Sequence, residues 1–385
     1  MFLKPYGYDE IYKIIKTLNK TNAVGYDEVS TKIIKECATE LTPIITYLIN
    51  QSFEEGIFPD ALKMAIVKPL FKKGDKNKVD NYRPITLVPI LSKIFETAMK
   101  RRVSEYLDKN NILRAEQYGF QKGKSTVLAC FNLVKNIMDN INDRNRVSVI
   151  FFDMSKAFDF VAHSLLLDKL ENYGIRGPIL NWFKSYLADR KQFVEILCED
   201  KKNHLTGVNS EERYNRYGVP QGSVLGPLLF LIYINDLPNV ITNKCFLFAD
   251  DISVILTSPT HSDINTYYND INSSITSITD WLYSNNLYVN LSKTKIVQFG
   301  THQSKDTLLN ITHNGVNISE ETESRFLGIT LDKYLSWKPH VNNVCIKINK
   351  FVYVLHKENI ITMYSFICIS WVCRCFPKIW HSALG

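Results

Sequence analysis

The chain has 385 residues, of which 45% are hydrophobic and 22% are charged, and its formal net charge is +7. This length and ordinary composition predict a large core shared by two or three subdomains, and they exclude a disordered or low-complexity chain. No apolar stretch reaches the ~18 residues of a membrane-spanning helix, and the first residues lack the apolar run of a secretory signal. We therefore expect an intracellular protein with no membrane segment, in the nucleus or the cytoplasm.

The positive charge is concentrated in one segment. Residues 60–124 hold 15 basic and 7 acidic side chains, whereas the rest of the chain holds 31 basic and 32 acidic ones. Localised positive charge is typical of a protein that binds a phosphate backbone or a nucleoside triphosphate. A solvated basic surface is the alternative interpretation.

The cysteines are scattered and include no C-x-x-C pair. In a reducing compartment this argues against both a disulfide framework and a zinc ribbon, so we expect most of them to be buried apolar side chains. Cys368, Cys373 and Cys375 form the one cluster, and their spacing is not that of a usual zinc site.

The first sixty residues are expected to be helical. Thr42 before Pro43 predicts a helix start, apolar residues recur at helical spacing after it, and Gly56 predicts the end of that helix. Residues 64–84 predict a strand, a basic turn and a return strand. Residues 91–108 then show the pattern of an amphipathic helix.

Three apolar runs predict buried strands. Val147–Phe152 is almost continuously apolar, which is typical of a strand covered on both faces, and Asp153 ends it. Residues 245–248 and 252–256 are separated only by an Ala-Asp-Asp sequence. This pair predicts a tight hairpin with an acidic tip.

The remaining segments give coarser predictions. A charge-free run at 224–234 predicts a buried helix that begins near Ser223, with Pro227 in its first turn. Residues 281–300 predict a helix end followed by a strand, and residues 323–331 predict one further strand. The rest of the chain is expected to be helical.

Acidic residues stand at the ends of these buried strands. Asp153 follows the first, and Asp250 and Asp251 lie at the hairpin tip. Carboxylates beside apolar strands incur desolvation and repulsion unless bases or divalent cations neutralise them. Oxygen ligands favour Mg²⁺ or Mn²⁺, and a pair of such ions can serve phosphoryl transfer. The alternative for a single Asp is a strand-end cap or a turn residue.

Seven segments stand out as motifs. The central three are 151–159 (FFDMSKAFD), 218–227 (GVPQGSVLGP) and 248–251 (FADD). They resemble motifs A, B and C of non-LTR retrotransposon reverse transcriptases, those of jockey-like insect elements most closely. The other four follow the order of that family: the fingers motifs 81–85 (NYRPI) and 117–126 (QYGFQKGKST), motif D at 290–294 (NLSKT) and motif E at 326–328 (FLG). The resemblance covers roughly residues 5–350.

The resemblance implies a role for the acidic residues. Asp153 and Asp250 hold two metal ions, Mg²⁺ or Mn²⁺, and Asp251 completes the carboxylate set. Lys293 resembles the motif D lysine that protonates the pyrophosphate leaving group, and a solvated lysine is the alternative. Asp159 is expected to supply a supporting hydrogen bond rather than a metal ligand.

The resemblance also places basic residues over the triphosphate of the incoming nucleotide. Lys72 and Arg83 lie on opposite arms of the predicted basic hairpin. An arginine fork suits phosphate oxygens, and a lysine supplies a point charge. Lys68 and Lys73 are alternatives to Lys72 in this role.

Three further residues are implied to contact the nucleotide. Phe158 resembles the aromatic gate that excludes a ribose 2′-hydroxyl, and core packing is the alternative. Gln221 and Gly222 are expected to let the backbone approach the nucleotide and template closely, and a turn at a helix start is the alternative.

The fold class implied is α+β, a right-hand polymerase with an antiparallel palm sheet, basic fingers and a short helical thumb. Its expected divisions are an N-terminal helical extension (1–60), the fingers (61–146), the palm with its fingers and palm helices (147–332) and a truncated thumb-like helical tail (333–385). Residues 360–385 resemble the family only loosely. The chain is therefore expected to be the polymerase core of a longer polyprotein.

The activity implied is RNA-directed DNA synthesis, in which deoxynucleotides extend a primer 3′-hydroxyl by two-metal phosphoryl transfer. The expected partners are an RNA template, a DNA primer and dNTPs, with no membrane. One alternative is a catalytically inactive remnant of an element that only binds nucleic acid. A second alternative, an RNA-directed RNA polymerase, is disfavoured by Phe158.

Overall fold

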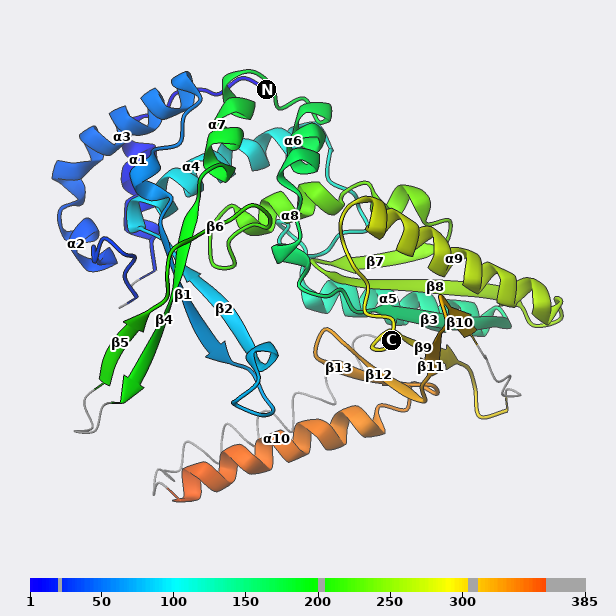
Figure 1. Cartoon of the computed structure of the whole chain (residues 1–385). Coiled ribbons are helices and arrows are strands. Elements are labelled where there is room, and N and C mark those ends of the chain that lie inside the picture. The colour runs from blue at the N-terminus through cyan, green and yellow to red at the C-terminus, as the bar shows by residue number, and fades with distance from the viewer. Residues whose placement is uncertain (20–22, 200–204, 304–310, 358–385) are drawn as a thin grey trace.

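The computed structural model describes residues 1–19, 23–199, 205–303 and 311–357 (Figure 1). The N-terminal part is helical, as predicted, with α1 (Tyr8–Thr17), α2 (Thr31–Glu36) and α3 (Ala38–Glu55). The predicted start of α3 at Thr42 was wrong. Thr42 lies inside the helix, where its hydroxyl donates to the Ala38 carbonyl. Pro43 also lies inside the helix, where it has no N–H to donate to the preceding turn. Gly56 ends α3 in the left-handed conformation, as predicted.

A six-stranded sheet forms one half of the molecule (Figure 1). In spatial order its strands are β10 (Ile311–His313), β11 (Val316–Glu320), β9 (Lys295–Phe299), β3 (Asn145–Phe152), β8 (Asp251–Pro259) and β7 (Lys244–Phe248). Neighbouring strands are antiparallel except β11 and β9, which are parallel. The predicted strand at 147–152 is confirmed as part of β3. The hairpin predicted at 245–256 is confirmed as β7 and β8.

Residues 147–152 of β3 are almost all apolar because helices cover both faces of the sheet. These helices are α5 (Thr126–Asn142) and α9 (Ile264–Ser284). Val149 and Phe151 pack in the core cluster that contains the buried residues of α5, whereas Ile150 and Phe152 pack in the cluster that contains those of α9. Successive side chains of a strand point to opposite faces, so β3 supplies both cores.

The second sheet is built around the basic hairpin. Its strands are β2 (Tyr82–Leu87), β1 (Ala65–Phe71), β4 (Lys191–Glu199) and β5 (Leu205–Asn209), with β6 (Arg213–Tyr214) paired to β4. Phe71 opposes Tyr82 in the antiparallel pair β1–β2, which confirms the predicted strand, turn and return strand. The expectation that the rest of the chain is helical was wrong for β4, β5 and β6. β4 pairs in parallel with β1, a partner far away in sequence that no local pattern reveals.

Helices and a small hairpin complete the fold. The helices are α4 (Ile90–Lys109), α6 (His163–Asn172), α7 (Pro178–Leu187), α8 (Gly226–Ile234) and α10 (Lys338–Lys357). α4 and the buried α8 are confirmed, with Pro227 in the first turn of α8. The single strand predicted at 323–331 is instead the hairpin β12 (Glu323–Phe326) and β13 (Ile329–Asp332), because Leu327 and Gly328 turn with positive φ.

The combined helix and sheet content gives an α+β fold, as expected. Among the described residues, no helix has both the length and the apolar character to cross a membrane. Cys368, Cys373, Cys375 and the loosely resembling segment 360–385 lie outside the described residues.

A buried glutamate of α4 holds the start of α8. The Glu96 carboxylate accepts N–H bonds from Val224 at 2.6 Å and Leu225 at 3.1 Å, and a hydroxyl bond from Ser92 at 3.0 Å. Its side chain is fully buried. A negative charge at a helix N-terminus also interacts favourably with the positive end of the helix dipole.

We expect Glu96→Ala to lower the free energy of unfolding by about 3 kcal/mol, because the buried N–H of Leu225 and the partly buried N–H of Val224 lose their acceptor. Urea denaturation measures this loss. The matched control on the same helix is Glu105→Ala, since Glu105 is exposed and its contact with Arg102 is long, at 3.6 Å. This control is expected to change stability by less than ~1 kcal/mol, and an equal loss in both variants contradicts the prediction.

Candidate active site

Strand register brings three carboxylates to one edge of the six-stranded sheet. Phe152 opposes Ile252 in the antiparallel β3–β8 pair, so the next residue, Asp153, lies opposite Asp251. Phe248 opposes Asp251 in the β7–β8 pair, which leaves Ala249 and Asp250 as a two-residue turn. The structure therefore places the three predicted acidic residues together.

The electrostatics of this edge show that the carboxylates affect one another. Burial raises the pKa of Asp250, and repulsion from Asp153 adds to that rise. The pKa of Asp251 is raised to about 6, first by loss of hydration and then by the charges of Asp250 and Asp153. Asp251 nevertheless keeps an exposed surface. Neighbouring negative charges in a partly dehydrated place are the setting in which a cation gains most.

Lys293 lies beside the first carboxylate. Its Nζ is 3.6 Å from a carboxylate oxygen of Asp153, and both side chains are largely exposed, so the contact is weak. The loop that carries Lys293 is nevertheless fixed, because the Asn290 N–H donates to the Asp153 carbonyl at 2.8 Å and the Ser155 N–H donates to the Tyr288 carbonyl at 3.0 Å. The structure therefore brings this predicted residue to the acidic edge.

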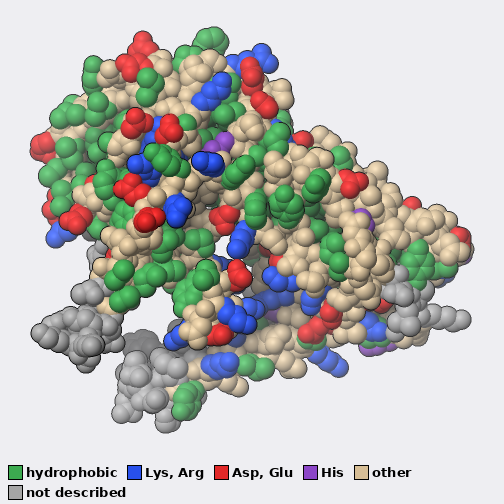
Figure 2. Space-filling view, viewed as in Figure 1, with side chains coloured by type: hydrophobic (Ala, Val, Ile, Leu, Met, Phe, Trp, Pro, Cys, Tyr) green, Lys and Arg blue, Asp and Glu red, His purple; other side chains and the backbone are tan. Residues whose placement is uncertain are grey.

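The basic hairpin faces the same edge. Against the larger effect of burial, the charges of Arg83 and Lys72 both lower the pKa of Asp250, which places them within electrostatic reach of that carboxylate. Both side chains are exposed. Lys68 instead pairs with Glu195 at 2.7 Å, and this contact makes it a weaker alternative to Lys72. Figure 2 shows lysine and arginine side chains beside acidic ones around a hollow near the middle of the molecule.

The loop before α8, which contains Gln221 and Gly222, is hydrogen-bonded to β2 and to Asp159. The Thr86 N–H of β2 donates to the Gln221 carbonyl at 2.7 Å, and the Gln221 side chain donates to the Asp159 carboxylate at 2.9 Å. A Cβ on Gly222, whose φ is 119°, would lie 2.5 Å from the Thr86 carbonyl oxygen. Glycine is required there because the backbones approach closely. Asp159 makes the supporting hydrogen bond expected of it.

Phe158 follows Asp153 closely in the chain and is only partly buried. Its ring stacks on Phe230 of α8, with centroids 4.5 Å apart and an interplanar angle of 24°. The contact fixes the ring against the core while leaving part of it open. This geometry fits both the gate and the packing interpretation of the sequence.

Sequence reasoning gave Gln117 no role beyond its place in a fingers motif. In the structure its side-chain oxygen accepts N–H bonds from Gly119 at 2.8 Å and from Ala249 at 3.0 Å. Gln117 therefore touches the turn that carries Asp250. The only signal available in the sequence was the motif itself.

The donors at the acidic edge suit a hard divalent cation. They are carboxylate oxygens, and their mutual repulsion falls when a cation binds between them. Within the described ranges no three His, Cys, Asp or Glu side chains already form a metal-binding group. Charge and donor type therefore support metal binding at Asp153, Asp250 and Asp251, which stays a prediction.

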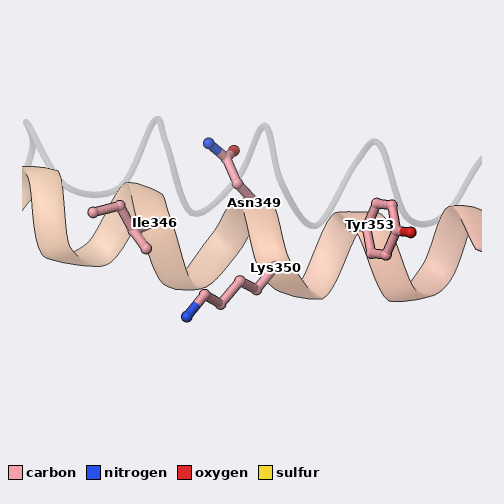
Figure 3. A pocket seen from close by; sticks show the side chains of 4 residues that line it. All are labelled: Ile346, Asn349, Lys350 and Tyr353. Carbon is pink, nitrogen blue, oxygen red and sulfur yellow. The ribbon is translucent and has the colours of Figure 1, made fainter.

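Two pockets lie apart from these carboxylates. One is a shallow groove of α10 lined by Ile346, Asn349, Lys350 and Tyr353 (Figure 3). The other lies between residues 23–28 and the sheet of the basic hairpin, and the Lys68–Glu195 ion pair lines it. Neither pocket is lined by any of the three aspartates.

An acidic sheet edge faced by a basic hairpin is suited to bind phosphate groups through divalent cations and basic side chains. A family model described as reverse transcriptase (RNA-dependent DNA polymerase) matches residues 71–331. The chain belongs to this family.

Curated relatives come from mobile elements. The chain is 31% identical over 348 residues to the probable RNA-directed DNA polymerase from transposon BS of Drosophila melanogaster, covering 88% of this chain and 37% of that protein. It is 26% identical over 349 residues to the RNA-directed DNA polymerase from mobile element jockey of Drosophila funebris, covering 88% and 36%. The resemblance to jockey-like non-LTR elements is confirmed. The chain spans little more than a third of the length of these relatives.

Replacing one carboxylate by an amide is expected to stabilise the protein when divalent cations are absent. Asp251→Asn removes one of three repelling charges, and we expect the free energy of unfolding at pH 7 in EDTA to rise by about 1 kcal/mol once solvent screening is included. Thermal or urea denaturation measures the change. The matched control is Asp270→Asn on the exposed side of α9. A loss of stability in Asp251→Asn, with no change in the control, is the opposite of this expectation.

Proposed function

We propose that this chain is the RNA-directed DNA polymerase of a non-LTR retrotransposon. It extends a DNA primer on an RNA template with dNTPs. The observation that carries the proposal is the meeting of Asp153, Asp250 and Asp251 at one sheet edge, with Lys72 and Arg83 within electrostatic reach of Asp250. Membership of the reverse transcriptase family supports the same reaction.

Asp153, Asp250 and Asp251 are proposed to hold two divalent ions, Mg²⁺ or Mn²⁺. Such ions, when bound, activate the attacking hydroxyl and stabilise the charge of the leaving phosphate. The three aspartates bring their negative charges together at one edge of the sheet, where they would hold these ions. Lys72 and Arg83 extend from the opposite hairpin, where they are suited to bind the triphosphate oxygens.

Phe158, Gln221 and Gly222 are proposed to select the nucleotide. Phe158, held against Phe230, blocks a ribose 2′-hydroxyl. Gln221 and Gly222 bring the backbone close to the nucleotide and template, with the loop braced by Thr86 and Asp159. Replacing any of these is therefore expected to alter substrate use as well as rate.

The right-hand division of the chain is also proposed. The six-stranded sheet forms the palm, and the basic hairpin with residues 61–146 forms most of the fingers. β4 pairs with β1, and β5 and β6 pair with β4, which favours assigning these strands to the fingers. Residues 1–60 form the N-terminal helical extension, and the described part of 333–385, chiefly α10, forms the start of a thumb-like tail.

The central test is primer extension. With a DNA primer, an RNA template, dNTPs and Mg²⁺, we expect the wild-type chain to extend the primer and Asp250→Asn to lose more than ~100-fold in rate, beyond the loss typical of an outer-shell residue. Asp270→Asn serves as the matched control. Wild-type extension no faster than that of Asp250→Asn contradicts the proposal.

Other results of the same assay point to the alternatives. Salt-sensitive RNA binding without extension indicates an inactive remnant that only binds nucleic acid. Preferential incorporation of ribonucleotides indicates an RNA-directed RNA polymerase and removes the proposed role of Phe158.

Lys293 is proposed to act as the general acid for the pyrophosphate leaving group. Lys293→Gln is expected to lower kcat by ~100-fold or more with little change in KM for dNTP, because a positioned acid acts in the transition state. Steady-state extension kinetics measure both constants. Lys295→Gln is the control, since its side chain pairs with Glu321 at 3.7 Å. Equal kcat values for the two variants contradict the role.

A further inference from the structure

We propose that Gln117 is a positioning residue that fixes the turn bearing Asp250 and thereby the positions of the Asp250 and Asp251 carboxylates. The inference rests on the proposed polymerase function, because it concerns the same acidic edge. It assigns Gln117 no contact with substrate or metal.

The contacts of Gln117 converge on this turn. The side chain is 2% exposed, and its Oε1 accepts the Ala249 N–H at 3.0 Å and the Gly119 N–H at 2.8 Å. The backbone around it is joined to β7, since the Tyr118 N–H donates to the Leu247 carbonyl at 2.7 Å. The Leu247 N–H donates in turn to the Glu116 carbonyl at 2.9 Å. Residues 116–119 therefore cover the outer edge of β7 and reach the turn.

The turn needs such a support for three reasons. Ala249 has φ 55°, a left-handed conformation that costs energy for a residue with a Cβ. Its successor Asp250 is repelled by Asp153. β7 is also the last strand of the sheet, so no further strand of that sheet holds the turn from outside. An acceptor on the Ala249 N–H opposes relaxation of both the strained residue and the repelled one.

A second observation shows that the two segments are in direct contact. A Cβ added to Gly119 would lie 2.5 Å from the Ala249 nitrogen. The covering segment is itself fixed from its other side, because the Lys124 ammonium donates to the carbonyls of Gln117 at 2.6 Å and Ala115 at 2.8 Å. A fixed segment in contact with the turn can hold it in place.

Gln117 acts here only as an acceptor. Its Nε2 is buried and has no hydrogen-bond partner among the described residues. Gln117→Glu keeps an oxygen acceptor for both bonds, and burial beside the acidic edge is expected to hold its carboxyl group in the neutral form. Gln117→Met keeps the length of the side chain and loses both bonds. The two variants separate positioning by hydrogen bonding from simple filling of space.

The experiment compares Gln117→Met, Gln117→Glu and wild type in primer extension, thermal unfolding and hydrogen exchange of a peptide spanning residues 244–252. We expect kcat of the Met variant to fall by ~10–100-fold, the range for residues that orient a metal ligand. KM for dNTP is expected to stay near the wild-type value, and exchange at the turn to become faster. Gln117→Glu is expected to stay nearer to wild type in both rate and exchange.

The matched control is Gln192→Met in β4, which removes a single bond from Asn215 at 3.1 Å, away from the acidic edge. It is expected to change thermal stability without changing exchange at 244–252. The proposal is overturned if Gln117→Met keeps its kcat, or if Gln117→Glu loses as much as Gln117→Met. If the wild type itself does not extend a primer, the proposed function fails, and exchange at the turn still tests the positioning role.

Discussion

Holding like charges together is the constraint on which the rest of this structure depends. Burial and mutual repulsion raise the pKa of both Asp250 and Asp251, with Asp153 contributing to each rise. The fold resists this repulsion because β3 has antiparallel partners on both sides and packs its two faces against α5 and α9. Since side chains alternate along a strand, a slip of one residue in the β3–β8 pair would turn the acidic residues away from one another.

Segments from three distant parts of the chain close around this edge. The basic hairpin brings Lys72 and Arg83, and the loop before α8 is bonded to that hairpin through Thr86. Residues 116–119 cover β7 on its outer side. Each segment is held by backbone hydrogen bonds, so the position of the charged side chains is set by the backbone rather than by surface ion pairs. The weak, exposed contact between Lys293 and Asp153 fits this distinction.

The same contacts change how single residues are interpreted. Lys68 and Lys72 are both candidates in the sequence, but in the structure Lys68 forms an ion pair with Glu195. Gly222 is needed where two backbones meet, and this requirement holds whether or not the loop also approaches a nucleotide. Phe158 stacks on Phe230, so packing and substrate selection use the same ring.

The sequence by itself determined the elements whose signals are local. Four features were predictable: the apolar run of β3, the Ala-Asp-Asp turn between β7 and β8, the basic hairpin, and α8 with Pro227. Strand and helix periodicity and turn chemistry depend on residues that are close together in the sequence. The motif order also sufficed to identify the family. Only the tertiary structure decided the start of α3, the strands β4 to β6 and the contact of Gln117 with Ala249. These depend on partners far away in the chain, which propensity and spacing do not specify.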